Sequence, residues 1–237
     1  MSDTKTDLPT AKPHGSGTAE DAIYEKILAA IFDHRLTPGT KLGEDRLAAI
    51  FGVNRARIRR VLPRLAHEGV VALEPNRGAF VAKPTIAEAR DVFQARRLIE
   101  PGIVDQLMRQ PGLAATLPRL RRHVAAEARA RGTGDTRAIV RLSGEFHMLL
   151  AEAAGNSLLA KNMRELTSLT CLIIALYDRP SVPSCLGEEH GEIVDAIASG
   201  NAGRARELMI HHLNHVEGNL DLTAIERSPA ELEDVLG

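Results

Sequence analysis

The sequence predicts a mainly α-helical protein, in which a small N-terminal unit of three helices and a hairpin precedes an antiparallel helical bundle. The 237-residue chain is 44% hydrophobic but only 3% aromatic, so its core must consist mainly of Leu, Ile, Val and Ala, a composition that favours helices. Apolar residues recur with helical spacing along most of the chain. Two short β-rich runs flank a Pro-Asn-Arg-Gly turn at 75–78, which predicts one hairpin.

The composition divides the chain into four segments. Residues 1–17 are rich in Thr, Pro, Gly and Ser and have no apolar period, so we expect a disordered tail. Residues 18–83 form the first predicted domain and residues 84–222 the second, with a linker around Lys83 and Pro84. Residues 223–237 are predicted to be an acidic tail.

The first two helices have clear end signals. Thr18 is a suitable N-cap for a first helix that extends toward the Thr-Pro-Gly turn at 37–39. A second, short helix is predicted from Glu44 to Phe51. Gly52 then suits the left-handed position that ends many helices.

The third helix carries an arginine-rich start. Asn54 is its predicted N-cap, and its apolar side chains share one face. Pro63 lies inside it, so we expect either a kink or a proline whose missing hydrogen bond is on the solvent side. The remaining face carries arginines, at positions Arg55, Arg57, Arg59 and Arg60. A guanidinium group can bond guanine O6 and N7 together, so these residues predict a DNA-reading helix, with a solvated basic face as the alternative.

The hairpin completes a winged helix-turn-helix. Its strands are expected at 70–73 and 79–81. Arg77 and Gly78 at its tip are predicted to contact a phosphate or a minor groove, and an ordinary exposed turn arginine is the alternative.

The second domain is predicted to be entirely helical. Helices are expected at 85–109, 112–131, 135–154, 156–178, 184–199 and 202–220, separated by Pro-, Gly- and Asn-containing turns. Six antiparallel helices of this length form a bundle with room for an interior cavity.

Charge and cysteine content exclude several classes of protein. The net charge is −1, which argues against a polycationic coat protein, whereas five arginines and one glutamate at 54–68 indicate a local basic stripe. The two cysteines, Cys171 and Cys185, indicate neither a disulfide framework nor a thiolate zinc site. The N-terminus lacks the apolar run of a signal peptide, and the longest apolar run, 169–176, is too short for a membrane span. We therefore expect a cytoplasmic protein with no membrane partner.

Together, these motifs resemble the GntR family of bacterial transcription regulators. The resemblance rests on 42–48 (LGEDRLA), 52–59 (GVNRARIR), 65–71 (LAHEGVV) and 76–81 (NRGAFV). The second domain resembles the FCD, or FadR-like, branch at 96–100 (RRLIE), 145–150 (EFHMLL), 154–156 (AGN), 189–193 and 209–213. At Arg60 the family commonly has glutamate, which makes this helix more basic and leaves the operator preference open.

The resemblance to the FCD branch implies a divalent metal site. Many of these regulators hold an ion such as Zn²⁺ with three histidines and one acidic residue. The histidines correspond to His147, His190 and His212. The acidic residue would be four positions before the first histidine, where this chain has Ser143, so the sequence leaves open whether the ion is bound. His211 points away from its neighbour and is predicted to be a surface residue.

Arg96 is the predicted effector contact. It lies on the apolar face of its helix, and an inward-facing arginine needs a partner such as a ligand carboxylate. Glu100, one turn later, is the alternative partner. Ser143 is predicted to hydrogen-bond the same ligand.

The predicted function is a ligand-responsive DNA-binding regulator and no enzyme. We expect a homodimer that binds a short inverted repeat of double-stranded DNA and represses transcription until a small carboxylate-type metabolite releases it. The alternative is a metal-responsive regulator in which the ion itself is the signal. A three-histidine hydrolase would leave the winged domain unexplained. The sequence leaves open the effector, the operator, the regulated genes and the choice between repression and activation.

Overall fold

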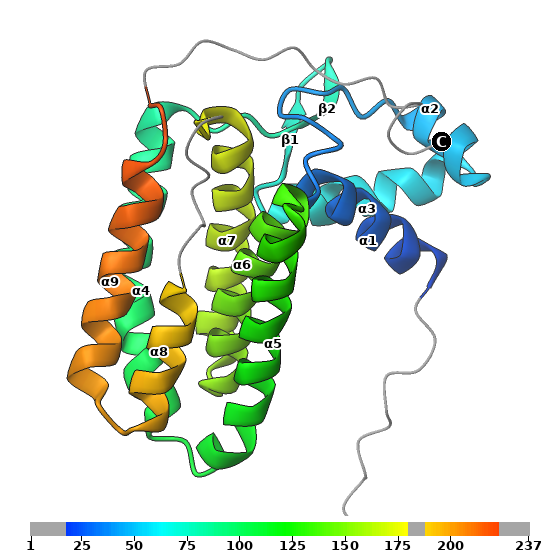
Figure 1. The fold of residues 1–237 in the computed structure, drawn as a ribbon. Coiled ribbons are helices and arrows are strands. Elements are labelled where there is room, and N and C mark those ends of the chain that lie inside the picture. Colours follow the sequence, from blue (N-terminus) through cyan, green and yellow to red (C-terminus); the bar gives the residue numbers. More distant parts are fainter. Residues whose placement is uncertain (1–17, 180–187, 223–237) are drawn as a thin grey trace, which may run out of the picture.

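The computed structural model describes residues 18–179 and 188–222, which form two helical units joined side by side (Figure 1). The predicted tails at 1–17 and 223–237, the start of the helix predicted from 184, and Cys185 lie outside the described residues. The helices in the described part are α1 (Ala19–Phe32), α2 (Glu44–Phe51), α3 (Arg55–His67), α4 (Ile86–Met108), α5 (Leu113–Thr133), α6 (Thr136–Ala153), α7 (Ser157–Tyr177), α8 (Glu189–Ala198) and α9 (Ala202–Gly218). The mainly helical class is confirmed.

The N-terminal unit has the predicted helix ends. Thr18 caps α1 in a capping box, in which its hydroxyl accepts from the Asp21 backbone N–H at 3.2 Å. Gly52 ends α2 in the left-handed conformation, with φ 63° and ψ 34°. Asn54 caps α3 by accepting from the Arg57 backbone N–H at 3.1 Å. α1 ends at Phe32, before the predicted Thr-Pro-Gly turn, because the chain first turns through 33–36.

The helix α3 continues through Pro63, which lies on its exposed side. The opposite side buries Ile58, Val61, Leu62 and Leu65 against α1 and α2. Of the two predicted outcomes, the second holds, because a proline on the solvent face leaves the buried packing intact.

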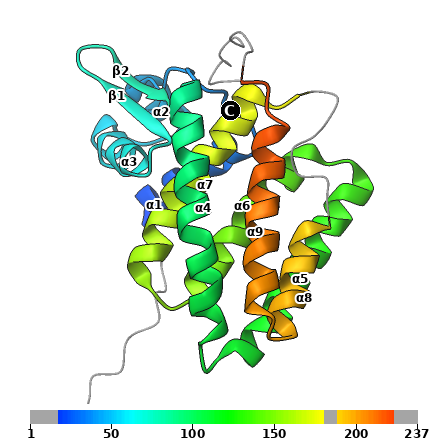
Figure 2. The same cartoon turned by 90° about the vertical axis from the view of Figure 1, so that its left-hand side faces the viewer.

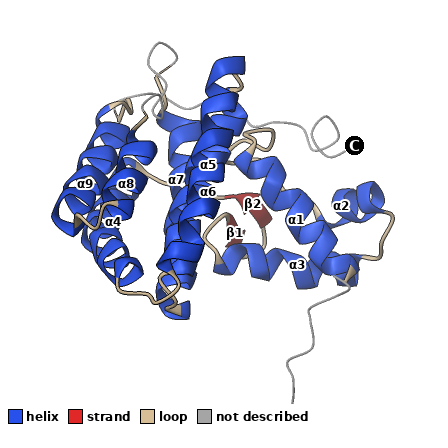
Figure 3. Ribbon diagram, turned by 60° about the horizontal axis from the view of Figure 1, so that its bottom comes forward, coloured by secondary structure: helices blue, strands red, loops and turns tan. Residues whose placement is uncertain are grey.

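The wing is a two-stranded antiparallel hairpin of β1 (Val71–Glu74) and β2 (Gly78–Val81), shown in red in Figure 3. Val71 pairs with Val81 and Glu74 with Gly78. Lys41 makes a bridge to Phe80, which attaches the wing to the segment before α2. The tip residues Asn76, Arg77 and Gly78 line one groove with Arg55 and Arg59 of α3, as a winged helix-turn-helix requires.

The six helices α4–α9 form the predicted antiparallel bundle (Figure 2). α4 packs along α9 and α6 along α7, while α5 packs on α6 and α8 on α9. Their main core contains Phe146, Leu150, Met163, Ile193 and Met209. None of the described helices combines the length and the apolar character that a membrane span needs.

The two units share a core at α7. Leu172, fully buried, belongs to the apolar cluster of the N-terminal unit. One turn earlier, Leu169 lies so close to Gly69 that a Cβ at that glycine would be 3.3 Å from it. The Tyr177 hydroxyl donates to the backbone oxygen of Pro84 at 2.9 Å. α7 therefore contacts both the bundle interior and the winged unit.

Candidate functional site

The arginines of α3 lie on its exposed face in two groups. Arg55 and Arg59 share the carboxylate of Glu44, at 3.1 and 2.7 Å, on the side of α2. Arg57 and Arg60 meet Glu20, at 3.7 and 2.5 Å, on the side of α1. The side chains of Arg59 and Arg60 remain 63% and 61% exposed. All four predicted arginines are therefore accessible, although Asn54 itself serves as the cap of α3.

The wing tip lies next to the α2 side of this surface. Arg77 is 70% exposed, is paired with Glu74 and lies 5.4 Å from the ring centroid of Phe80. Gly78 has φ +101°, which a side chain would strain. A groove between the wing and α2–α3 has more cationic than acidic side chains in its lining: Lys41, Arg46, Arg55, Arg59 and Arg77 against Glu44 and Asp45.

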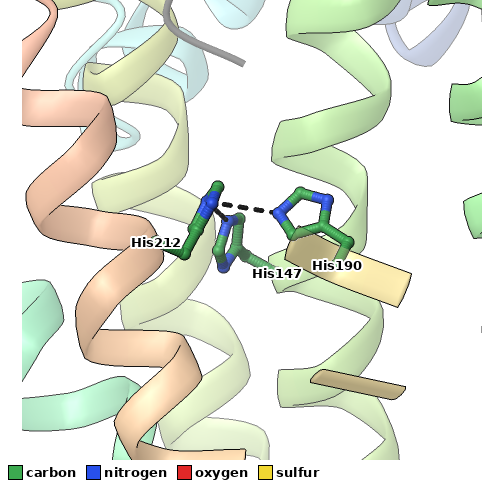
Figure 4. A group of neighbouring side chains, drawn as sticks. All are labelled: His147, His190 and His212. Atoms are coloured by element: carbon green, nitrogen blue, oxygen red, sulfur yellow. Dashed lines mark hydrogen bonds between the residues drawn. The ribbon is translucent and has the colours of Figure 1, made fainter. Parts of the chain in front are cut away.

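The three predicted histidines come together inside the bundle. His147 of α6, His190 of α8 and His212 of α9 are 2–6% exposed and point toward one another (Figure 4). The Nε2 atom of His212 lies 3.2 Å from Nε2 of His147 and 3.2 Å from Nε2 of His190. His211 is 72% exposed, as predicted.

A carboxylate lies behind each histidine. Glu100 of α4 contacts Nδ1 of His147 at 2.5 Å, and Glu127 of α5 contacts Nδ1 of His190 at 2.9 and 3.0 Å. Glu189 contacts Nδ1 of His212 at 2.8 Å. An ionised carboxylate only accepts hydrogen bonds. Glu100 and Glu189, whose pKa values are about 2, therefore fix the proton on Nδ1 of His147 and His212, and Glu127 does the same for His190 when it is ionised. In each case the Nε2 lone pair faces inward.

The donor set fits a divalent ion. Nitrogen lone pairs that face one another at 3.2 Å repel unless a cation lies between them. Tetrahedral Zn²⁺ with bonds of about 2.0–2.1 Å places neighbouring nitrogens about 3.3 Å apart. Histidines whose second nitrogen donates to a carboxylate are typical zinc ligands. His147, His190 and His212 are therefore the residues that could hold such an ion.

Burial keeps two of these imidazoles neutral. It lowers the pKa of both His147 and His190 well below the usual 6.5. Burial alone would raise the pKa of Glu100, but the guanidinium of Arg96 and the hydrogen bond from His147 lower it to about 2. Burial raises the pKa of Glu127 to about 7. Neutral imidazoles are the form that binds metal ions.

Ser143 lies beside the histidines, with Glu127, Arg131, Glu189, His190 and His212 lining the same cavity. The cavity volume is about 10 Å³, roughly enough for one water molecule or ion. The described residues thus enclose an interior cavity, but a small one.

Arg96 is buried and mainly paired within the bundle. Its Nε donates to Glu100 at 2.6 Å and its Nη1 to the Thr170 hydroxyl at 3.1 Å. The partner is thus Glu100, the alternative that the sequence left open. Its Nη2 is buried and has no hydrogen-bond partner among the described residues. Arg96 is not among the cavity-lining residues, so it reaches the histidines through Glu100.

The sequence did not identify three residues that matter here. Glu189 could have been found, because it directly precedes a candidate histidine on the same helix. Glu127 carries no such signal, since it follows an alanine-rich stretch and reaches His190 only through helix packing. Leu172 looked like an ordinary bundle residue, yet it packs in the winged unit.

Two family matches cover most of the described chain. Residues 19–81 match "Bacterial regulatory proteins, gntR family", and residues 91–215 match the FCD domain. Similar curated proteins include an HTH-type transcriptional regulator in an unstable DNA locus of Streptomyces ambofaciens, 29% identical over 89% of this chain and 88% of its own length. LutR of Bacillus subtilis is 28% identical over 77% of this chain and 92% of its own. A protein of Escherichia coli K12 named for regulation of the L-lactate dehydrogenase operon is 27% identical over 83% and 84%.

Solved structures have the same fold. A GntR regulator from Rhodococcus sp. RHA1 superposes with a TM-score of 0.70 at 24% identity, covering 84% of this chain and 95% of its own. E. coli McbR/YncC gives 0.72 at 15% identity, covering 86% and 97%. With a DNA-reading winged helix-turn-helix followed by a helical effector-binding domain, the chain belongs to the FCD branch of the GntR family, whose members are transcription regulators and not enzymes.

Proposed function

We propose that this regulator is a homodimeric repressor that leaves its operator when a small carboxylate-type metabolite binds the helical domain. Its DNA-binding domain would span 18–83, and 84–222 would bind effector and form the dimer. A two-fold protein suits a short inverted repeat of double-stranded DNA. A cytoplasmic location would give the protein access to its DNA. One relative is named for an L-lactate operon, which supports a small carboxylate.

DNA contacts are assigned to the exposed face of α3 and to the wing. Arg55, Arg57, Arg59 and Arg60 would enter the major groove, with Asn54 at the helix start and Arg77 and Gly78 at the wing tip. The cationic groove between wing and α3 supports this assignment, because phosphates run along both edges of the major groove.

His147, His190 and His212 would hold a divalent ion, Zn²⁺ or a similar one, at their converging Nε2 atoms. When bound, the ion would supply a Lewis acid to which an effector carboxylate binds. Ser143 would donate to that carboxylate from the same cavity. Arg96 does not line this cavity, so its Nη2 group, buried without a partner among the described residues, would become a further donor when the bundle opens around the metabolite.

The observation that carries the proposal is a continuous series of contacts from the histidines to the winged domain. His147 contacts Glu100, Glu100 contacts Arg96, and Arg96 donates to Thr170 of α7. Two residues later, Leu172 is buried in the winged-domain core. A ligand that favours one position of Arg96 would therefore favour one position of the DNA-binding unit.

Fluorescence anisotropy with DNA from upstream of the protein's own gene would test this function. A scrambled duplex serves as the control, and each titration is run at two salt concentrations. We expect binding about a hundredfold tighter than to the scramble, and weaker when Zn²⁺ and a candidate acid such as L-lactate are added together. Equal, salt-erased binding to both duplexes would contradict sequence-specific recognition of this upstream DNA.

Thr170→Val tests the coupling. It keeps the shape of the side chain but removes the hydroxyl that accepts from Arg96. We expect normal Zn²⁺ and DNA binding and a smaller effect of effector on DNA binding. Thr167→Val is the matched control, because the Thr167 hydroxyl, one turn earlier and also buried, has no partner among the described residues. An unchanged effector response in T170V would exclude this route.

The alternative is that the ion itself is the signal. The cavity volume of about 10 Å³ favours it, because an ion fits there and a metabolite requires the bundle to open. DNA release by Zn²⁺ alone, reversed by a chelator, would support the ion as signal. Release only when an acid is also present would support the metabolite.

A further inference from the structure

The three carboxylates behind the histidines differ in what compensates their charge. Glu100 is paired with Arg96 at 2.6 Å and is buried with it. Glu189 is shared by three imidazoles, since it contacts Nδ1 of His212 and His215 at 2.8 Å and lies 3.5 Å from His211.

Glu127 is compensated least. Its side chain is 3% exposed, and both of its oxygens lie within 3.0 Å of a single nitrogen, Nδ1 of His190. The guanidinium of Arg131 is 3.9 Å away and Nε2 of His123 is 3.6 Å away, both beyond a normal hydrogen bond. A buried carboxylate in this position is costly unless a positive charge approaches it.

The cavity beside the histidines offers that place. One cavity is lined by Glu127, Ser143, His190 and His212. Ser143 is on α6, one turn before His147. A carboxylate at position 143 would enter the cavity that His190 and His212 also line. Position 143 has serine instead. On the His190 side, the carboxylate is that of Glu127, which contacts the outer nitrogen of the imidazole, Nδ1, and not the Nε2 that faces the ion site.

We propose that Glu127 is a positioning residue that supplies the ion site's balancing negative charge through His190. Its carboxylate holds the Nδ1 proton, fixes the ring and makes Nε2 a stronger donor toward the ion. Glu127 on α5 thus supplies through His190 the negative charge that an acidic side chain at position 143 would supply by binding the ion directly. This inference rests on the proposed ion site.

Zn²⁺ affinity, measured by competition with a chromophoric chelator, provides the test. Glu127→Gln keeps an oxygen that accepts from Nδ1 but removes the charge, and we expect it to weaken Zn²⁺ binding about 10- to 100-fold. Adding Ser143→Asp to E127Q should restore affinity to within a few-fold of the natural protein. Glu152→Gln, on α6 and paired at the surface with Arg119 and Arg164, is the matched control and should leave Zn²⁺ affinity unchanged.

A second measurement keeps the test independent of folding defects in E127Q. Ser143→Asp alone should tighten Zn²⁺ binding much less in the natural background than in E127Q, because Glu127 already supplies the charge. Nitrogen NMR of the His190 ring should also report an Nδ1–H tautomer that is lost or mixed in Glu127→Ala.

The outcomes separate this inference from the proposed function. No Zn²⁺ binding by the natural protein would remove the ion site itself. If the natural protein and E127Q bind Zn²⁺ with equal affinity, the ion site is supported but the role of Glu127 is overturned. A weakened E127Q that S143D does not rescue would overturn the charge-balancing role.

Discussion

Arginine–carboxylate pairs occur in two contrasting regions, the surface of α3 and the interior of the bundle. At the surface, Arg55 and Arg59 share Glu44 while more than half exposed. In the bundle, Arg96 and Glu100 are only 2–3% exposed. An exposed pair is worth about 0–1 kcal/mol and exchanges partners readily, whereas breaking a buried pair costs several kcal/mol. The surface arginines can therefore leave their carboxylates for DNA, while Arg96 is held as part of the scaffold.

Arg96→Met should have the largest effect. It leaves Glu100 buried without its guanidinium partner, and we expect a loss of about 3–5 kcal/mol in the free energy of unfolding. Urea denaturation in the presence of a chelator measures it. Arg97→Met is the matched control, because the neighbouring Arg97–Glu217 pair is partly exposed and should contribute about 0–1 kcal/mol. Similar losses in the two variants would remove the contrast between buried and exposed pairs.

Arg59→Ala should act on DNA binding and not on stability. If Arg59 leaves Glu44 to read a base, its loss should cost about 1–3 kcal/mol on the specific duplex and relax base preference. Arg77→Ala at the wing should weaken all duplexes more evenly, because a phosphate contact carries no sequence information. Anisotropy with specific and scrambled DNA distinguishes the two. Equal losses on both duplexes for R59A would refute base reading.

The winged unit was predictable from the sequence because its signals are local. Thr18, Gly52 and Asn54 act on backbone groups within a few residues, so cap chemistry identified the helix ends. The hairpin strands differ from their predicted bounds by only one residue. The resemblance to a known family then supplied the three histidines, which the fold brings together.

The outer part of the candidate site was not predictable. Glu127 reaches His190 across 63 positions of sequence, and no local pattern encodes that contact. The core that contains Leu172 was not predictable either. Its helical spacing predicts that it is buried, but does not indicate whether it packs in the bundle or in the winged unit. The small cavity depends on how six helices pack, a property that helix lengths alone do not determine.

The buried histidines should make the ion-free protein sensitive to mild acid. Because burial lowers the pKa of His147 and His190 well below 6.5, the unfolded chain binds protons that the folded chain excludes as the pH falls below that value. Glu127 has the opposite effect on stability. Its pKa is raised to about 7, so between about pH 7 and pH 4.5 the folded chain holds a proton that the unfolded chain has released. Over the interval from pH 6.5 to 5.5 each of the three groups contributes about 1 kcal/mol, so the net loss should be about 1 kcal/mol.

Urea denaturation at the two pH values, with chelator present, measures this loss. Glu127→Gln removes the opposing contribution and should steepen the dependence to about 2 kcal/mol over the same interval. A stability that is flat or rises on acidification in the natural protein would mean that the two imidazoles are not kept neutral by burial.

Glu44→Gln should have the smallest effect and tests the exposed half of the comparison most directly. It removes the carboxylate that Arg55 and Arg59 share, so stability should change by about 0–1 kcal/mol. DNA affinity should rise by up to about fivefold, because the arginines no longer exchange one negative partner for another. Glu145→Gln, an exposed partner of Arg141 in the bundle, should leave DNA binding unchanged. Weaker DNA binding by E44Q would mean instead that Glu44 holds Arg59 in the position from which it contacts a base. The exposed pairs would then have a structural role, like the buried Arg96–Glu100 pair.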